Sequence, residues 1–269
     1  MHRPLLFLAI GAAGALAPLA VRDSVEDRYC YAQWDDNSMI QNGAYDGRFT
    51  FFRVRFEPSY GGGGGGRFGR GRGNDKKWDH DTPRAERHLM QILDEITMLR
   101  PQMDCGAIYA FGEPESFKYP VAYVSEPGFW TMDETELKGI REYVAKGGFI
   151  IFDDFFQQHW YNFEERWREA FPDLQLQPIP RTHALFDAFY DIRDVHLFYQ
   201  GGGGTRGVEA EFYGAFEDND PTKRLVAIAA YNFDLGEYME FSDEAFVPID
   251  LSNEAYKIMV NYLIYAMTH

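Results

Sequence analysis

The stretch GGFIIFDDFF, residues 147–156, decides the fold of this chain. Its two glycines end a helical pattern that begins near Thr131, and the residues Phe149 to Phe152 form an unbroken apolar run. Strands that are buried on both faces have continuous apolar runs, whereas half-exposed strands alternate apolar and polar residues. The stretch therefore predicts a strand of a parallel sheet with helices on both faces.

The segments before this strand repeat the alternation of strand and helix. The run FTFFRVRFE from Phe49 is rich in aromatic and β-branched residues and predicts the first strand. Asp81-Thr82-Pro83 predicts a helix start, with Asp81 as the capping side chain. A capping-box spacing at 131–134 starts the second helix, and two short apolar runs, 107–111 and 121–124, lie between the helices.

The C-terminal half continues the same pattern. A third helix is expected from about Asn162 to Pro172, and a closing helix from about Asn253. The runs 208–216 and 225–230 flank the turn-rich EDNDP and predict a hairpin added to the sheet. We therefore predict a single α/β domain over residues 48–269, built on a mostly parallel sheet.

The first 20 residues have the form of a signal peptide, with a basic start, the apolar run from Leu5 to Ala20, and small residues near its end. An uncleaved membrane anchor is the alternative. Residues 21–47 are polar and irregular, and we interpret them as a linker or an N-terminal arm. The expected location is therefore the periplasm or cell envelope of a bacterium.

Composition excludes some partners. The formal net charge of −16 argues against nucleic acid, because phosphate binding needs a clustered positive surface. Export permits a disulfide between Cys30 and Cys105, but two isolated cysteines form no framework, and two separate thiols remain the alternative. The sequence leaves open the oligomeric state and any cofactor or metal.

Residues 61–77 combine an unbroken glycine run, 61–66, with five basic side chains. Such a segment has high backbone entropy, so we expect a mobile loop. A lid that binds an anion is the alternative, although the glycine spacing fits no phosphate-binding motif. The second glycine run, 201–204, is interpreted as a plain loop.

Polar side chains follow several of the predicted strands, where ligands bind in an open parallel sheet. We expect a cleft at this edge formed by the following residues: Glu126, Trp130, Asp153, Asp154, Asn232 and Asp234. Carboxylates that are held together must share protons, pair with arginines or bind a cation. Each possibility makes this edge a candidate ligand site.

Structural roles are open for the same side chains. Asp153 or Asp154 can cap a following helix, and Glu126 can pair with Arg53 or Arg55 on the first strand. His183 lies in a predicted loop and can support catalysis by Asp153 or Asp154, or can be an ordinary histidine, either at the surface or with its hydrogen bonds satisfied. The motifs of zinc proteases, thiol oxidoreductases and serine hydrolases do not occur.

Several segments in order resemble a bacterial family, domain-of-unknown-function family 4159, over about residues 48–269. They are RFTFFRVRF, RFGRGRG, DHDTPRAERHL, SFKYPVAYVSEPGFW, GGFIIFDDFF and NYLIYAMTH. The resemblance implies the flavodoxin-like three-layer sandwich of class I glutamine amidotransferases and of trehalose-utilisation proteins. It implies the fold more than the function, since one fold hosts many activities.

Amidotransferase activity is not expected. That chemistry needs a cysteine nucleophile on a tight strand-to-helix turn, and neither Cys30 nor Cys105 lies at one. The trehalose-utilisation relatives imply a carbohydrate-related ligand. The segment 182–186 resembles their His-Pro-hydrophobic turn, with Ala184 in place of proline.

Three functions therefore remain open. The first is a cell-envelope domain that binds a sugar-like or anionic molecule through the acidic edge, the basic loop and aromatics such as Trp130 and Trp160. The second is a carboxylate- or metal-dependent hydrolase acting on carbohydrate-type substrates, with Asp153, Asp154 or His183 in catalysis. The third is a non-catalytic interaction module of an envelope complex.

Overall fold

The computed structural model describes residues 42–59, 76–199, 207–244 and 247–269. The predicted signal peptide, most of the predicted arm 21–47, nearly all of the basic loop 61–77 and the glycine run 201–204 lie outside the described residues. Within the described part, no helix is long and apolar enough to cross a membrane. Cys105 is disulfide-bonded, and Cys30, the other cysteine of the sequence, lies outside the described residues.

The described residues form a seven-stranded sheet in the order β2-β1-β3-β4-β7-β6-β5. The strands are β1 Phe52–Val54, β2 Ala107–Tyr109, β3 Val121–Ser125, β4 Phe149–Phe155, β5 Leu176–Pro178, β6 Glu211–Phe216 and β7 Leu225–Tyr231. β2, β1, β3, β4 and β7 pair in parallel, whereas β6 is antiparallel to both β7 and β5. The five parallel strands have the 2-1-3-4-5 order of flavodoxin-like folds. The predicted α/β class and mostly parallel sheet are thus confirmed.

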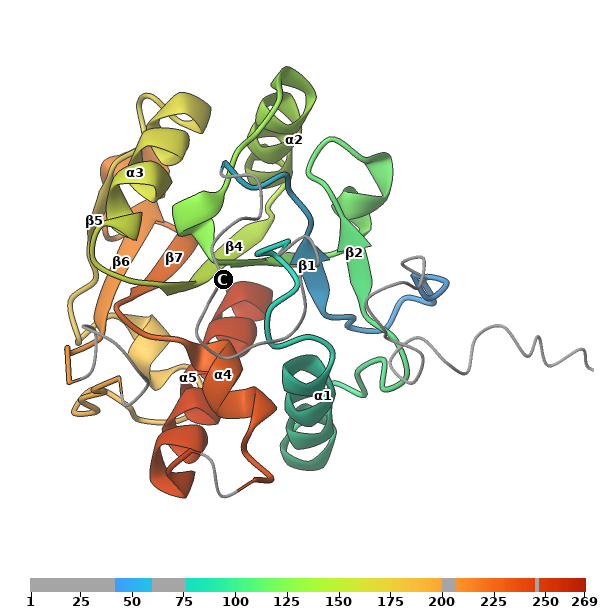
Figure 1. Ribbon diagram of the computed structural model, residues 1–269, viewed down its shortest axis with the longest axis vertical. Coiled ribbons are helices and arrows are strands. Elements are labelled where there is room, and N and C mark those ends of the chain that lie inside the picture. The colour runs from blue at the N-terminus through green and yellow to red at the C-terminus, as the bar shows by residue number, and fades with distance from the viewer. Residues whose placement is uncertain (1–41, 60–75, 200–206, 245–246) are drawn as a thin grey trace, which may run out of the picture.

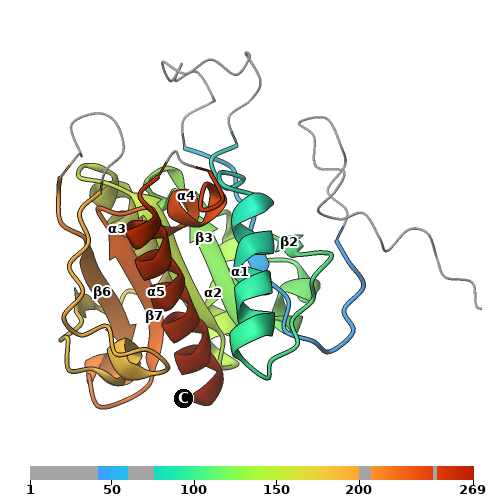
Figure 2. The ribbon, with the colours of Figure 1, turned by 90° about the horizontal axis from the view of Figure 1, so that it is seen from below.

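Helices cover both faces of the sheet (Figures 1 and 2). α2 Glu134–Ala145 and α3 His159–Ala170 lie on one face, and α1 Arg84–Ile96, α4 Leu235–Glu240 and α5 Ile249–Thr268 lie on the other. Short 3-10 helices occur at Pro114–Lys118, Pro127–Phe129, Ala184–Asp187 and Glu217–Asn219. The result is a three-layer sandwich.

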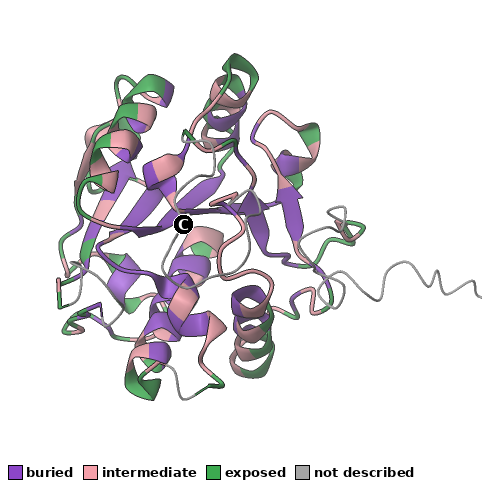
Figure 3. Ribbon diagram, in the orientation of Figure 1, coloured by how far each residue is buried: buried purple, intermediate pink, exposed green. Residues whose placement is uncertain are grey.

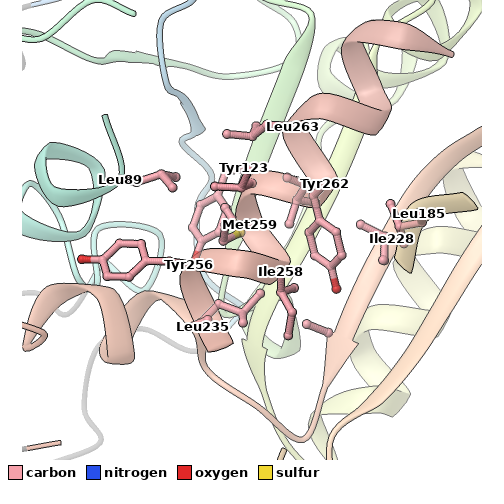
Figure 4. Close-up of a cluster of buried hydrophobic side chains, with 14 of the residues drawn as sticks. Leu89, Tyr123, Leu185, Ile228, Leu235, Tyr256, Ile258, Met259, Tyr262 and Leu263 are labelled. Carbon is pink, nitrogen blue, oxygen red and sulfur yellow. The ribbon is translucent and has the colours of Figure 1, made fainter. Parts of the chain in front are cut away.

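Alternate residues of β4 enter different cores. Phe149 and Ile151 pack in the core under α1, α4 and α5, whereas Ile150 and Phe152 pack in the core under α2 and α3. The strands are accordingly buried throughout the centre of Figure 3, and Figure 4 shows α5 packing its apolar face on the first of these cores. Burying each such side chain contributes roughly 1.5–3 kcal/mol, which explains the continuous apolar run of residues 149–152.

The helix predictions are confirmed in type, with differences at their ends. The capping box of α2 lies at 133–136 and not at the predicted 131–134: the Asp133 carboxylate accepts hydrogen bonds from the amides of Thr135 and Glu136, whereas the Thr131 hydroxyl donates to the Glu57 carbonyl. α3 and α5 begin a few residues before Asn162 and Asn253. The cap predicted for α1 is wrong, because Pro83 occupies that position and the Asp81 side chain makes no capping bond. The sequence analysis did not predict α4 or β5.

Candidate functional site

A pocket of about 400 Å³ lies at the carboxyl edge of the parallel strands, next to α4. Its lining comprises five carboxylates, two histidines and three aromatic rings: Asp81, Glu126, Asp154, Asp234, Glu237, His80, His159, Phe156, Tyr199 and Phe241. His80 and Asp81 come from the segment after β1, and Glu126, Asp154 and Asp234 come from the ends of β3, β4 and β7. The pocket thus lies where the order of strands reverses, the usual ligand position of such sheets.

The backbone is left-handed at three of the acidic residues. The φ angle is 63° at Asp81, 45° at Glu126 and 59° at Asp154. A non-glycine residue in this region costs roughly 1–3 kcal/mol, so the surrounding packing must hold it there. At Asp154 the cause is an irregularity in β4, where the pairing with β7 shifts register between Phe152 and Phe155.

Asp153 is fully buried and has a structural role. Its carboxylate accepts hydrogen bonds from the Leu235 amide at 3.1 Å, the Gly236 amide at 3.0 Å and the Tyr123 hydroxyl at 2.7 Å. Burial raises the pKa of Asp153 to about 6, although these three hydrogen bonds oppose the increase. The carboxylate therefore anchors the first turn of α4, in agreement with the capping alternative for Asp153.

Asp154 faces the pocket instead. Its side chain is 9% exposed, and the His80 ring lies beside it, with Nδ1 at 3.9 Å from Oδ2. No hydrogen bond reaches its carboxylate from any residue that the structure describes. Burial raises the pKa of Asp154 well above its usual value, and repulsion from Glu126 and Asp81 adds to the increase.

Glu126 lies between a lysine and a histidine. Its Oε2 is 3.0 Å from the Lys77 ammonium, and its Oε1 is 3.3 Å from His80 Nδ1. The predicted alternative, a pair between Glu126 and Arg53 or Arg55, is wrong: Arg53 binds Glu86 at 2.6 Å, and Arg55 binds Glu113 at 3.1 Å. Each of these two arginines has its own carboxylate partner, so neither forms the predicted pair with Glu126.

Asp81 and Asp234 form the inner wall near α4. Asp234 Oδ1 accepts a hydrogen bond from the Glu237 amide at 2.8 Å, which caps α4. Asp81 Oδ2 is buried without a hydrogen-bond partner in the described part of the chain. A Cβ atom at Gly236 would lie 2.3 Å from this oxygen, so glycine is needed there. Burial raises the pKa of both carboxyl groups well above the usual value.

Two groups of side chains have the geometry of metal ligands. His80, Glu126 and Asp154 form one, and Asp81, Asp154 and Asp234 form the other; within each group the ligand atoms lie within 4.8 Å of one another. Ligands of one ion are separated by at most twice a metal–ligand distance of roughly 2.1–2.5 Å, or about 4.2–5 Å. Both groups therefore fit around an ion with small inward shifts.

The pocket also has an aromatic wall and a second histidine. Phe156 and Tyr199 pack with ring centroids 4.6 Å apart, and the Tyr199 hydroxyl donates to Glu237 at 2.8 Å. Burial lowers the pKa of His159, which favours a neutral imidazole. A Cβ atom at Gly128 would lie 2.3 Å from His159, so this glycine makes room for the ring.

Three of the residues predicted for the site, Glu126, Asp154 and Asp234, converge in the pocket. Asp153, described above, and Trp130 and Asn232 do not line it. Trp130 is 1% exposed and packs on Phe152 in the core under α2 and α3. Asn232 is buried, and its Oδ1 accepts a hydrogen bond from the Gln157 amide. These two predictions are corrected because both side chains are used in packing and loop structure.

His183 lies at the opposite edge of the sheet. Its ring packs on the ring of Tyr265. The Tyr265 hydroxyl accepts a hydrogen bond from the amide of Leu225, at the start of β7. Its Nδ1 accepts the Leu185 amide, which caps a 3-10 helix, and burial lowers its pKa. A role for His183 beside Asp154 is therefore wrong. Trp160 is half-buried and packs on Tyr213, outside the pocket lining.

Sequence reasoning missed His80 and Asp81 as site residues. The sequence DHD at 79–81 was a usable signal, since it follows the first strand and precedes a helix. Only Asp81 was considered, as a helix cap, because a long glycine run separates these residues from the first strand in the sequence.

Fold and pocket together define a flavodoxin-like α/β protein with an acidic pocket at the carboxyl edge of its sheet. The chain belongs to a family described as a domain of unknown function (DUF4159), whose family model matches residues 67–267. This match confirms the family resemblance seen in the sequence. A comparison with curated proteins found no match.

Proposed function

We propose that the protein is a metal-dependent hydrolase whose ion is held by His80, Glu126 and Asp154. The observation that carries this proposal is the convergence in an open pocket of one imidazole, from the segment before α1, and two carboxylates, from the ends of β3 and β4. Catalytic metal sites have three protein ligands and leave a further position for water or substrate. The pocket volume of about 400 Å³ leaves room for both.

Hydrolysis needs an activated water and a group that accepts its proton. A bound divalent ion lowers the pKa of water to about 7 in the best-studied zinc enzymes. His159 lines the same pocket, and burial lowers its pKa, which favours the neutral form. It accepts a proton from water by giving up the long hydrogen bond, 3.5 Å, that its Nδ1 accepts from the Phe156 amide. Lys77 neutralises one oxygen of Glu126 and orients the other towards His80.

The lining favours a neutral, hydroxyl-rich substrate over an anion. Five carboxylates line the pocket and would repel a free anion, so the anionic ligand considered in the sequence analysis has less support. Sugar hydroxyls donate hydrogen bonds to carboxylates, and their rings pack on aromatic faces such as Phe156 and Tyr199. Binding of such a ligand without turnover remains the alternative proposal.

The amidotransferase-like form of the fold is also part of the proposal. Amidotransferases hold their nucleophile on a sharp strand-to-helix turn. Here a turn of this kind joins β3 to the 3-10 helix Pro127–Phe129, and Glu126 occupies it with left-handed backbone angles. A carboxylate in that place suits the binding of a cation and not amide transfer.

Export to the cell envelope completes the proposal. The signal-like residues 1–20 motivate it, and the disulfide-bonded state of Cys105 supports it, because disulfides persist in oxidising compartments. Fractionation of cells that express the full chain tests the location directly. Recovery of the protein from the cytoplasm with its N-terminus intact would contradict export.

Metal binding is tested first. Purified protein is treated with a chelator and titrated with Mn²⁺, Zn²⁺, Mg²⁺ and Ca²⁺ while its unfolding temperature is followed, because a ligand of the native state raises stability. We expect an increase that Asp154→Asn abolishes and that Asp194→Asn, an exposed control outside the pocket, retains. No response to any of these ions would contradict the proposal and favour the interaction module.

Turnover is tested second. The metal-loaded protein is assayed on nitrophenyl glycosides, esters and phosphates, with the Asp154→Asn and Asp194→Asn variants in parallel. Metal-dependent release of nitrophenol that only Asp154→Asn loses supports a hydrolase. Metal binding without turnover of any member of this panel, combined with stabilisation by sugars, would instead favour the ligand-binding domain.

A further inference from the structure

The two groups of candidate ligands share one residue. Asp154 belongs both to the group with His80 and Glu126 and to the group with Asp81 and Asp234. A carboxylate has two oxygens, so one aspartate can bind two ions at once. Shared ligands of this kind are typical of two-metal sites, in which the ions lie roughly 3.5–4 Å apart.

The hydrogen bonding of Asp154 and Asp81 points to a missing partner. The Asp154 side chain is more than nine-tenths buried, and within the described residues it receives no hydrogen bond. Asp81 Oδ2 is buried and likewise lacks a hydrogen-bond partner there. A buried carboxylate oxygen without a partner costs roughly 1–3 kcal/mol, or more when it is charged. By contrast, the neighbouring Asp153 has all of its partners within the protein.

The nearest buried cation does not supply that partner. The Arg53 guanidinium donates to Glu86 and to the Trp78 carbonyl, and it lies over the Tyr123 ring. It acts on Asp81 only through space, as a cation that lowers the pKa of that carboxyl group. A single ion on His80, Glu126 and Asp154 would therefore leave Asp81 and Asp234 facing each other without a bound cation between them.

We infer that the pocket binds two divalent cations bridged by Asp154, an outer ion held by His80 and Glu126 and an inner ion held by Asp81 and Asp234. This inference rests on the proposed metal site and adds a second ion to it. The inner set contains only oxygen ligands and suits a hard cation such as Mg²⁺ or Mn²⁺, whereas the imidazole of the outer set suits Zn²⁺ or Mn²⁺. Mn²⁺ fits both sets and is the probe of choice.

Stoichiometry on the wild-type full chain is the primary test. Chelator-treated protein is titrated with Mn²⁺ by calorimetry, and the loaded protein is examined by electron paramagnetic resonance. We expect two ions per chain with the signal of a spin-coupled pair. One ion per chain would overturn the inference and leave the proposed metal site standing, whereas no binding would remove both.

Single variants then assign the two ions. Asp234→Asn is expected to remove the inner ion and His80→Gln the outer one, each leaving one uncoupled Mn²⁺, with Asp194→Asn as the control that keeps the pair. Loss of a residue that hydrogen-bonds to a metal ligand lowers metal affinity roughly 10–100-fold. Loss of a ligand itself should lower the Mn²⁺ affinity of the affected site by more than this. Asp154→Asn removes a ligand of both ions and should abolish binding of the coupled pair. Two ions that stay coupled in Asp154→Asn, or that survive in Asp234→Asn, would overturn the bridged assignment.

Discussion

Asp153 and Asp154 are adjacent in the sequence, but their carboxylates have opposite environments. Asp153 is saturated by two amides at the start of α4 and by the Tyr123 hydroxyl, whereas Asp154 faces the acidic pocket with no hydrogen bond from the described residues. The irregular pairing of β4 with β7 and the left-handed backbone of Asp154 make this divergence possible. Asp153 thus holds α4 against the edge of the sheet, and Asp154 is available for a ligand.

The two asparagine variants at these positions should differ in stability. Asp153→Asn should lower the free energy of unfolding by about 1–3 kcal/mol, because charge-assisted hydrogen bonds to α4 are weakened. Asp154→Asn should leave the metal-free protein as stable as wild type or more stable, because it removes repulsion among buried carboxylates. Urea unfolding in the presence of a chelator measures both, and equal losses of stability would contradict the division of roles.

The stability of the metal-free protein should fall as the pH rises from about 4 through 6 and beyond. Burial raises the pKa of Asp153 to about 6 and raises the pKa values of Asp81, Asp154 and Asp234 well above their usual value. The folded state then binds more protons than the unfolded state, so its stability is greatest below the unfolded pKa and is lost as the pH passes the folded pKa.

Saturating Mn²⁺ should reduce this loss, because the ion replaces the protons, and the affinity for Mn²⁺ should rise with pH. Unfolding midpoints at pH 5.5 and 7.5, with and without the ion, measure both effects. Carboxylates outside the pocket also contribute to the pH dependence of stability, so Asp154→Asn is compared with wild type. Without the ion, the unfolding midpoint of this variant should depend less on pH. Identical pH profiles for the variant and wild type would contradict the assignment.

Gly236→Ala should disturb Asp81 specifically. The new methyl group would lie 2.3 Å from Asp81 Oδ2 and 3.0 Å from the Tyr123 hydroxyl, so the inner wall of the pocket must shift. We expect weaker binding of Mn²⁺ together with a modest loss of stability. Gly147→Ala is a useful contrast, because its strained φ of 97° costs stability but no atom lies within 4 Å of its added Cβ. Equal Mn²⁺ affinity in both variants would argue against Asp81 as a ligand.

His183→Ala should affect stability alone. Its ring caps a 3-10 helix at the far edge of the sheet, and loss of a cap costs roughly 0.5–2 kcal/mol. The response to Mn²⁺ should equal that of wild type. A loss of ion binding in this variant would contradict the position of the pocket at the carboxyl edge.

The sequence predicted the fold well where one physical cause dominates. The apolar run 149–152 is typical of a strand buried on both faces and is confirmed as β4. Helix α2 is confirmed too, although its capping box lies at 133–136 and not at 131–134. Helix α4 was missed because its six residues are too few to show a period. It forms because the carboxylates of Asp153 and Asp234 bind its first amides, and Asp153 comes from a distant strand.

The candidate site was predictable only in part. Parallel strand ends meet at one edge, so Glu126, Asp154 and Asp234 could be placed together from the order of elements. The direction in which each side chain points could not be predicted. Trp130 turned into the core because a large apolar ring gains more from burial, and Asp153 and Asp154 diverged through a backbone irregularity that leaves no pattern in the sequence.

Anomalous diffraction from crystals soaked in Mn²⁺ tests the central claim most directly. The account predicts anomalous peaks inside the pocket within about 2.5 Å of the Asp154 carboxylate, and none near Asp153. Crystals of Asp154→Asn should lack these peaks under the same soak. Wild-type crystals with an empty pocket, and with Mn²⁺ bound only at surface carboxylates, would contradict the claim.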